Sequence, residues 1–266
     1  CIFCAGHLNY GMKIRFRSFE NIVKEIDYNI REYGITHISI EDDTFTINKE
    51  LVRKVCGYFK KMKLTWNCNT RVNTVDYPLL KLMAESGCKK VAFGVESGNP
   101  EMLKKIKKNI TVEQVINATR YAKKAGIRYV ECDFILGSHP DETVNDIEDT
   151  IKLIYKIMPD FLMLSIMCPY PGTEIYTMML ERGYIKKINN WSQFSYFGKL
   201  DRYERLTYLT SKQMVEIQKK VLKEYYGSIK YIFSQLKQIR TINEIKYFTK
   251  IGFLFLKEFI FKTTAE

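Results

Sequence analysis

The first 173 residues alternate between two hydrophobic patterns. Short runs rich in β-branched and apolar residues predict strands, and apolar residues that recur at a spacing near 3.6 predict amphipathic helices between them. The predicted strands are residues 35–40, 64–72, 89–97, 127–137 and 161–167. The predicted helices begin near residues 19, 48, 76, 111 and 144, and each lies directly before one of these strands.

A strand–helix cycle of this kind builds a parallel sheet through right-handed crossovers. We therefore expect an α/β fold, either an open doubly wound sheet or a partial barrel, with a further strand before Cys1. Polar or glycine-rich positions lie near the strand ends, at residues 41–43, 69–71, 96–97, 133, 137 and 169–173. Parallel α/β folds bind their ligands at that edge, so the sequence predicts a ligand site there.

After residue 173 the cycle stops and the pattern becomes helical. It predicts a short helix at 174–183 and a longer one that opens with a capping box at Thr210 and weakens or ends at Gly227. We expect residues 1–173 to form the core domain and residues 174–266 to form a mainly helical C-terminal extension.

Within residues 241–266, the stretch 247–262 is dense in Phe, Leu and Ile but is interrupted by Lys250, Lys257, Glu258 and Lys262. It is too short and too charged to span a membrane. Two interpretations stay open: a helix that packs on the core or on a domain outside this chain, and a helix that lies in a membrane surface.

The charge and the cysteine content of the chain bear on its partners and on the cellular compartment in which it is found. The net charge is +12, with 25 Lys/Arg against 21 Asp/Glu in residues 1–173 and 17 against 9 in residues 174–266. This fits either a solvated lysine-rich surface or a basic face for an anionic partner. Several of the seven cysteines lie in or beside apolar runs, which favours reduced core thiols and a cytoplasmic protein, with peripheral membrane attachment left open.

The chain opens with Cys1-Ile2-Phe3-Cys4. Two thiolates at this spacing can hold a zinc ion, part of an iron–sulfur cluster or a redox pair. His7 could extend a zinc site, but no second cysteine or histidine pair supplies its remaining ligands.

Together with the strand ends, this opening resembles the radical S-adenosylmethionine (SAM) superfamily over nearly all of residues 1–173. The closest resemblance is to the subgroup that usually carries an N-terminal cobalamin-binding domain. Cys1 and Cys4 resemble the second and third cysteines of the family's Cys-x-x-x-Cys-x-x-Cys motif, with the usual aromatic at Phe3. The first cysteine would lie four positions before Cys1, so this chain should not hold its cluster well.

The resemblance implies a partial (β/α)6 barrel of parallel strands with a helical C-terminal extension, in a chain that lacks the barrel's first strand and first cluster cysteine. It implies metal ligands at Cys1 and Cys4, and SAM contacts at Glu41, Asp42, Asp43, Arg71, Glu96, Ser97, Ile135, Gly137, Pro171 and Gly172. The string from Gly137 to Pro140 departs from the family, whose glycine and proline are one residue closer together.

The function implied is binding of a [4Fe–4S] cluster and reductive cleavage of SAM to a 5′-deoxyadenosyl radical that abstracts a substrate hydrogen. Cobalamin-dependent methyl transfer or cyclisation would follow, with cobalamin held by a domain outside this chain. A small-molecule substrate and a reductant such as flavodoxin or ferredoxin are the expected partners, and nucleic acid is not. The alternatives are a tRNA methylthiotransferase-like enzyme, which would carry a small all-β RNA-binding domain at its C-terminus, and a basic zinc or nucleic-acid-binding protein.

Overall fold

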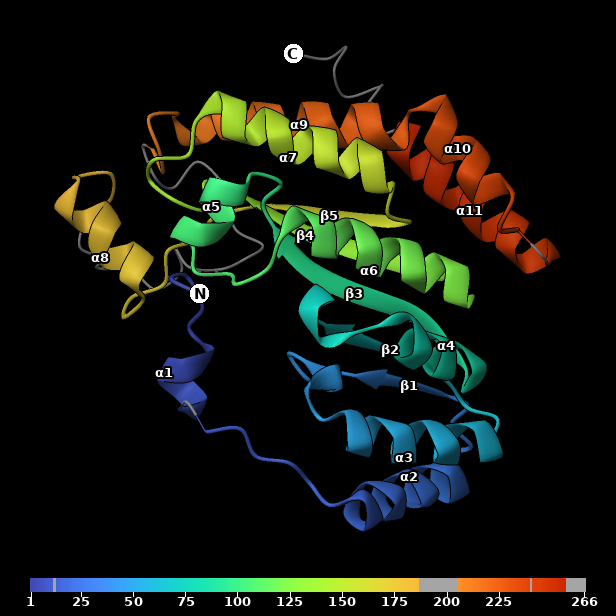
Figure 1. Ribbon diagram of the computed structural model, residues 1–266. Helices are drawn as coiled ribbons and strands as arrows, with labels where there is room; N and C mark the ends of the chain where they lie inside the picture. The colour runs from blue at the N-terminus through green and yellow to red at the C-terminus, as the bar shows by residue number, and fades with distance from the viewer. Residues whose placement is uncertain (12, 187–204, 240, 257–266) are drawn as a thin grey trace. The chain divides into compact units, whose positions relative to one another are not determined.

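The computed structural model describes residues 1–11, 13–186, 205–239 and 241–256 (Figure 1). The chain divides into two compact units, residues 1–218 and residues 219–266, which are described one at a time. The predicted domain boundary at residues 173 and 174 stays a prediction.

The first unit is built on one parallel sheet. Its strands follow one another in space in the order of the sequence, and each neighbouring pair is parallel. The bounds are β1 His37–Ile40, β2 Thr65–Thr70, β3 Cys88–Glu96, β4 Tyr129–Leu136 and β5 Phe161–Ile166. The predicted strands and the predicted parallel α/β fold are thus confirmed, while the sixth strand expected before Cys1 stays a prediction.

Helices connect the strands and provide the crossovers that parallel pairing requires. The helices of the first unit are α1 Gly6–Tyr10, α2 Phe19–Tyr33, α3 Lys49–Lys61, α4 Tyr77–Glu85, α5 Pro100–Lys105, α6 Val112–Ala125, α7 Val144–Ile157 and α8 Glu174–Glu181, with 3₁₀ turns at Phe45–Ile47 and Val72–Thr74. Local signals set their ends: Asn48 caps α3, the predicted capping box of Thr111 and Gln114 opens α6, and Gly34 ends α2 in the left-handed conformation.

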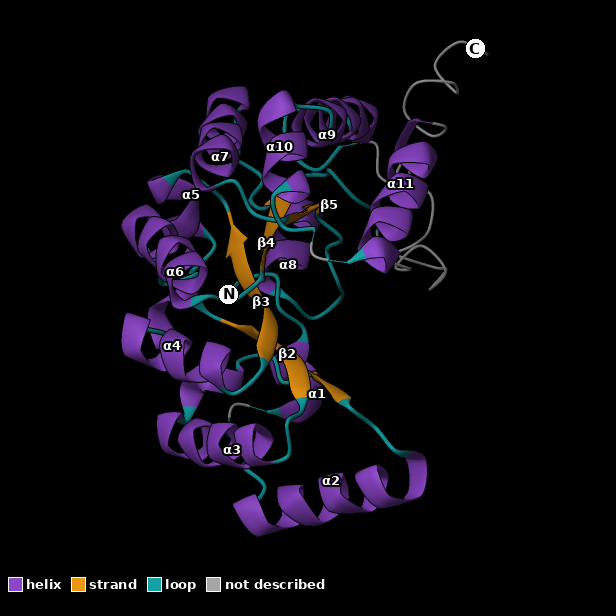
Figure 2. Cartoon of the chain, turned by 90° about the vertical axis from the view of Figure 1, so that its right-hand side faces the viewer, coloured by secondary structure: helices purple, strands orange, loops and turns teal. Residues whose placement is uncertain are grey.

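The two faces of the sheet differ. Helices α3, α4, α6 and α7 lie along one face (Figure 2). The side chains that point to this face are buried and apolar, for example Val91 and Phe93 of β3 and Cys132 and Phe134 of β4. Alternate residues point to the other face, as the two-residue period of a strand requires. Those residues are largely polar, so the second face can bind a ligand.

The C-terminal part of the chain is helical where it is described. Helix α9, Ser211–Tyr226, begins after Thr210 and ends at Gly227, as predicted. The second unit contains the end of α9 together with α10, Ile229–Leu236, and α11, Ile242–Leu256. Within the described ranges, no helix has the length and hydrophobicity needed to cross a membrane. Residues 187–204 and 257–266 of the predicted extension lie outside the described residues.

Candidate active site

The two N-terminal cysteines lie on a loop that the rest of the first unit holds in place. The N–H of Ile2 donates to the carbonyl of Ile106 (3.1 Å), and the N–H of Ile175 donates to the carbonyl of Ile2 (3.1 Å). The Ile2 side chain is buried. The loop is therefore pinned between the end of α5 and the start of α8, while the thiols of Cys1 and Cys4 are exposed.

These thiols fit part of a metal or cluster site. Among the described residues, no three His, Cys, Asp or Glu side chains come close enough together to hold a metal ion. Thiolates are the usual ligands of iron–sulfur clusters. Cys1 and Cys4 thus match two of the three thiolates that the family's cluster uses.

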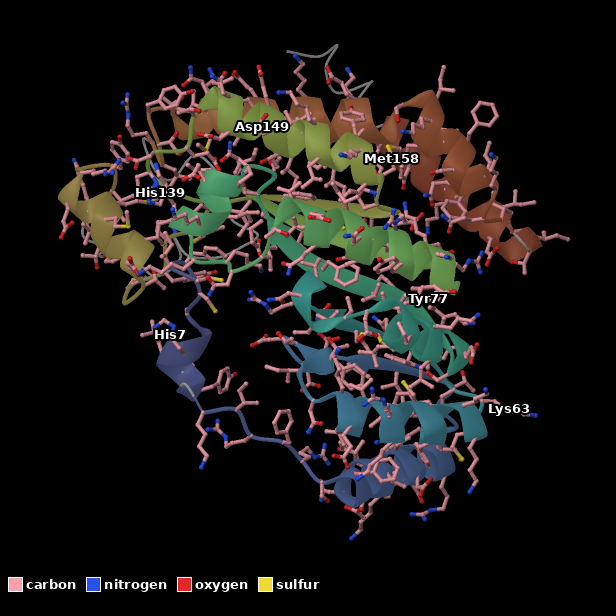
Figure 3. All side chains as sticks on the ribbon, in the orientation of Figure 1. His7, Lys63, Tyr77, His139, Asp149 and Met158 are labelled. Carbon is pink, nitrogen blue, oxygen red and sulfur yellow. The ribbon has the colours of Figure 1, made fainter. Side chains whose placement is uncertain are left out.

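Beside Cys4 lies a cavity of about 820 Å³ whose polar wall includes Glu41, Asp42 and Asp43. These three acids follow β1 and are exposed, and Glu41 accepts a hydrogen bond from Ser39. The cavity thus brings one predicted cluster ligand and the predicted acidic stretch together. His7 also lines the cavity and lies on α1 (Figure 3).

A buried ion pair lies at the end of β3. Lys108 Nζ donates to Glu96 Oε1 at 2.6 Å, and the two side chains are only 8% and 10% exposed. Gly94 makes room for this pair, because a Cβ added there would lie 2.9 Å from Glu96 Oε1 and 3.0 Å from Lys108 Nζ. Arg71, which follows β2, donates to the carbonyl of Lys108. Two predicted site residues, Arg71 and Glu96, therefore meet at Lys108.

Asp133 lies next to this pair on the polar face of the sheet, in register with Gly94. Burial raises the pKa of its carboxyl to about 7, and the carboxylates of Glu131 and Glu96 add to the effect. Asp133 Oδ1 is buried and has no hydrogen-bond partner within the described structure. This side chain can therefore hold a proton near neutral pH or accept a hydrogen bond from a ligand.

Farther from the strand ends, the same face carries a second ion pair. Lys90 Nζ donates to Glu131 Oε2 at 2.6 Å and lies 6.0 Å from the centre of the Phe161 ring. The side chains of Lys90 and Glu131 are partly exposed, at 30% and 17%. The polar face thus alternates acidic and basic groups from the middle of the strands to their ends.

The turn after β4 is held by a buried glutamate. Glu142 accepts from the N–H of Gly137 (2.5 Å) and from the hydroxyl of Ser138 (2.8 Å). Burial raises the pKa of Glu142 to about 7, against the opposing effect of these two hydrogen bonds. Gly137 has φ +73°, which favours glycine.

The turn also contains His139, the residue before Pro140. His139, at the left of Figure 3, is buried and accepts a hydrogen bond through Nδ1 from the N–H of Asp141 at 3.1 Å. Burial lowers the pKa of His139. Ile135, before the turn, lies on the polar face in register with Ser165.

The remaining predicted site residues lie in two places: Pro171 and Gly172 in the turn after β5, and Ser97 against α7. Gly172 follows β5 with φ +87°, and a Cβ added there would lie 2.8 Å from Leu8 of α1, so the turn at Pro171 and Gly172 approaches the segment that follows the cysteine loop. Ser97 is buried, and its hydroxyl lies 3.3 Å from that of Thr150 on α7. Ser97 is therefore turned toward the helical layer and away from Asp133.

Sequence reasoning missed Lys108, Glu131 and Lys90, and it named Asp133 among the strand-end positions of the predicted ligand site without giving it a SAM contact. Lys108 lies in a loop within a lysine-rich string, where no periodicity distinguishes it from its solvated neighbours. Lys90, Glu131 and Asp133 could have been found by their alternation with Val91, Cys132 and Phe134, because charged residues at every second strand position share one face.

Several known proteins are similar to this chain in sequence or in fold. The sequence model of the radical SAM superfamily matches residues 1–154. An uncharacterized methyltransferase of Pyrococcus horikoshii is 34% identical over 228 residues, which are 85% of this chain and 48% of that protein. The cytidylyl-2-hydroxyethylphosphonate methyltransferase of Streptomyces wedmorensis is 30% identical over 193 residues, 70% of this chain and 36% of the relative. The chain thus spans about half or less of the length of these relatives.

Among solved structures, the cobalamin-dependent SAM radical enzyme OxsB, with aqua-cobalamin and SAM bound, is similar with a TM-score of 0.59. The match covers 90% of this chain and 41% of OxsB at 15% sequence identity, so it supports the fold alone. The family match covers more than half of the sequence and includes Cys1, Cys4 and the ends of the first four strands. The chain therefore belongs to the radical SAM superfamily of enzymes.

Proposed function

We propose that this chain is the reaction core of an enzyme that cleaves SAM reductively at a [4Fe–4S] cluster. The single observation that carries the proposal is the cavity that joins Cys4 to the acidic residues after β1. Cys1 and Cys4 supply two thiolate ligands, and a third cysteine four positions before Cys1 completes the set. When bound, the cluster supplies the electron that breaks a carbon–sulfur bond of SAM, giving methionine and the radical that takes a hydrogen atom from the substrate.

The chain's own residues bind and orient SAM. Glu41, Asp42 and Asp43 accept hydrogen bonds from the amino group of the methionine moiety, since carboxylates are the strongest acceptors for such a donor. Lys108 and Arg71 bring positive charge to the methionine carboxylate. These acidic and basic groups come from different strand ends, so they fix both the position and the direction of the methionine moiety.

The other strand ends hold the nucleoside. Glu96 accepts hydrogen bonds from the ribose hydroxyls, and Ser97 stays a predicted contact of the same region. Ile135 and Gly137 give the adenine ring an apolar surface, and the turn at Pro171 and Gly172 closes over it. Asp133, whose pKa of about 7 allows either protonation state, holds or accepts a proton beside the ribose.

The reaction that follows radical formation is proposed to be cobalamin-dependent methyl transfer, or a cyclisation, on a small-molecule substrate. The similarity to two methyltransferases and to a cobalamin-dependent enzyme supports this choice. Cobalamin would be held by a domain outside this chain, and flavodoxin or ferredoxin would supply the electron. The methylthiotransferase alternative predicts a small all-β domain at the C-terminus of the whole protein, a prediction that the helices described in residues 211–239 and 241–256 do not test. Family membership leaves the zinc and nucleic-acid-binding alternative without support.

The test is anaerobic reconstitution of the natural protein with iron and sulfide, followed by reduction with dithionite in the presence of SAM. We expect visible absorbance of an iron–sulfur cluster and formation of methionine and 5′-deoxyadenosine. Cys4→Ser should abolish both signals, while Cys88→Ser, which changes the cysteine at the start of β3 and so at the opposite edge of the sheet, should keep them. Zinc without iron or sulfide, or a cluster without SAM cleavage, would contradict the proposal.

A further inference from the structure

Helix α10 of the second unit exposes most of its apolar side chains, while its polar residue Gln235 is buried. Ile229, Ile232, Phe233 and Leu236 recur at positions i, i+3, i+4 and i+7, so they share one face of the helix. Their exposed fractions are 73%, 46%, 59% and 55%, whereas Gln235 on the other side is only 6% exposed. A surface helix of a water-soluble protein shows the opposite arrangement, with its apolar side chains buried and its polar side chains exposed.

Helix α11 exposes a second apolar stripe. Ile242, Ile245 and Phe253 are 72%, 50% and 64% exposed, and their spacing of three and eight residues places them on one side of the helix. Together with the four residues of α10, they form what we call the α10–α11 apolar surface. Isolated exposed apolar residues are common on proteins, but seven within 25 residues require an apolar partner.

The charge of the same unit indicates what that partner is. Residues 219–266 carry 10 Lys/Arg and 4 Asp/Glu. Lys230 on α10, Lys237 directly after it, and Lys246 and Lys250 on α11 are exposed beside the apolar stripes. Lysines that flank an apolar helix face can extend toward lipid phosphates while the apolar residues enter the bilayer. A nucleic acid would neutralise the lysines but would leave the aliphatic side chains in water.

We propose that the α10–α11 apolar surface docks on an anionic membrane. The apolar side chains enter the boundary between headgroups and acyl chains, and the lysines lie at the level of the phosphates. No described helix can cross the bilayer, so this attachment is peripheral. It goes beyond the proposed chemistry and does not depend on it. The partner is thus an anionic lipid surface, with both an apolar and an electrostatic contribution to binding.

The test is flotation of the full chain with vesicles of phosphatidylcholine mixed with phosphatidylglycerol, and with vesicles of phosphatidylcholine alone. We expect the chain to float with the mixed vesicles, and raised salt to weaken this binding because surface charges are screened. The double variant Ile232→Ser/Phe233→Ser should lower the partition coefficient by about tenfold, because it removes apolar area from the membrane-facing side. Lys230→Gln/Lys237→Gln should lower binding to the mixed vesicles and leave the weaker binding to phosphatidylcholine unchanged.

Two control variants match these changes at other exposed positions. Tyr28→Ser/Tyr33→Ser removes exposed aromatic rings from α2, and Lys60→Gln/Lys61→Gln removes two charges from the end of α3. Both should float like the unchanged chain. The proposal is overturned if the unchanged chain does not float, or if Ile232→Ser/Phe233→Ser floats equally well. It is also overturned if sedimentation without lipid shows a dimer that this double variant dissociates, since a second copy would then cover the surface.

Discussion

At the residue scale, Glu96 combines an uncommon backbone conformation with a buried charge. Its φ of +74° lies in a region that few residues other than glycine adopt, and the register between β3 and β4 shifts between Gly94 and Glu96. Such a conformation persists only where surrounding contacts enforce it, and these contacts often serve a binding site. Here the enforcing contact is the ion pair with Lys108 over Gly94. The positive φ of Glu96 and its buried ion pair with Lys108 are therefore parts of the same local structure.

Removal of Lys108 should show how much this pair matters. Lys108→Met leaves the buried Glu96 carboxylate without its partner, so we expect the free energy of unfolding to fall by about 3 kcal/mol. Urea denaturation measures this loss. The double variant Lys108→Met/Glu96→Gln removes the uncompensated charge and should recover much of it.

The control for this change is the adjacent lysine. Lys107 pairs with Glu174 at 2.7 Å, but both side chains are more than half exposed. Lys107→Met should therefore change the free energy of unfolding by less than about 1 kcal/mol. Equal losses for Lys107→Met and Lys108→Met would show that burial of the Glu96–Lys108 pair has no energetic consequence.

Asp133 predicts a pH dependence whose sign follows from its raised pKa. The folded chain binds this proton more tightly than the unfolded chain, where an Asp titrates near about 3.9. Its contribution to stability is therefore complete below pH 4 and is lost as the pH rises toward the folded-state pKa of about 7. Asp133→Asn abolishes this loss, so between pH 5 and pH 8 the variant should gain roughly 2–3 kcal/mol relative to the unchanged chain.

Urea denaturation at the two pH values tests this expectation. Asp43→Asn removes a carboxylate that is exposed after β1, and its profile should run parallel to that of the unchanged chain. If Asp133→Asn also runs parallel, Asp133 is ionised without cost in the folded chain, and the proposed proton-holding role is lost.

The site could be predicted in part because its residues follow strands in sequence. Glu41 and Glu96 stand at strand ends that hydrophobic runs identify, so their convergence follows from parallel topology alone. Lys108 pairs with Glu96 only because the chain after α5 returns across Glu96, a tertiary contact that no local pattern encodes. Ser97 shows where the argument from strand ends fails. It directly follows Glu96 in the sequence, but its side chain points to Thr150 instead of toward the site.

At the element scale, the strands and most helices were predictable, including the short helix α8, whereas helices α1 and α5 were not predicted. Strands β3 and β4 each follow a clear helix stop, at Gly87 and Gly126 respectively, where the chain adopts positive φ. Helix α5 was missed because Asn99-Pro100 reads as a turn, although Asn99 caps the helix and Pro100 occupies its first position. Helix α1 spans one turn and a half, too short for an apolar period to appear.

The junction between β3 and α7 makes a prediction at this scale. A Cβ added at Gly98 would lie 2.6 Å from the carbonyl oxygen of Asp149 and 2.6 Å from Thr150 Cα, both backbone atoms of α7. Gly98→Ala must therefore displace α7 from the turn after β3, and it should lower the free energy of unfolding by roughly 1–3 kcal/mol.

A second glycine provides the matched control. Gly57 lies within α3 with open space around its Cα, so Gly57→Ala should stabilise the chain by up to about 1 kcal/mol through helix propensity. Thermal denaturation of the two variants compares these opposite signs. Destabilisation by both substitutions to the same extent would mean that the contact between Gly98 and α7 is not tight in solution.

At the scale of the whole molecule, the strands of the sheet differ in the number of neighbouring strands with which they pair. Strand β3 pairs with β2 and β4, whereas β1 pairs with β2 and has no other strand beside it among the described residues. The side chains of Ile38 and Ile40 line the 820 Å³ cavity between β1, α2 and α3 instead of packing against a neighbour strand. A strand edge of this kind exposes unpaired backbone groups to water.

This asymmetry predicts a gradient of amide hydrogen exchange across the molecule. Amides of β1 should exchange at least about tenfold faster than those of β3, because opening the edge breaks fewer contacts than opening the centre. Hydrogen exchange followed by mass spectrometry measures both strands in one experiment, and repeating it at two protein concentrations controls for self-association. Equal protection that persists on dilution would mean that another segment covers β1. Equal protection that is lost on dilution would identify a second copy at that edge, and in either case the open cavity beside Cys4 would not be the SAM-binding surface in solution.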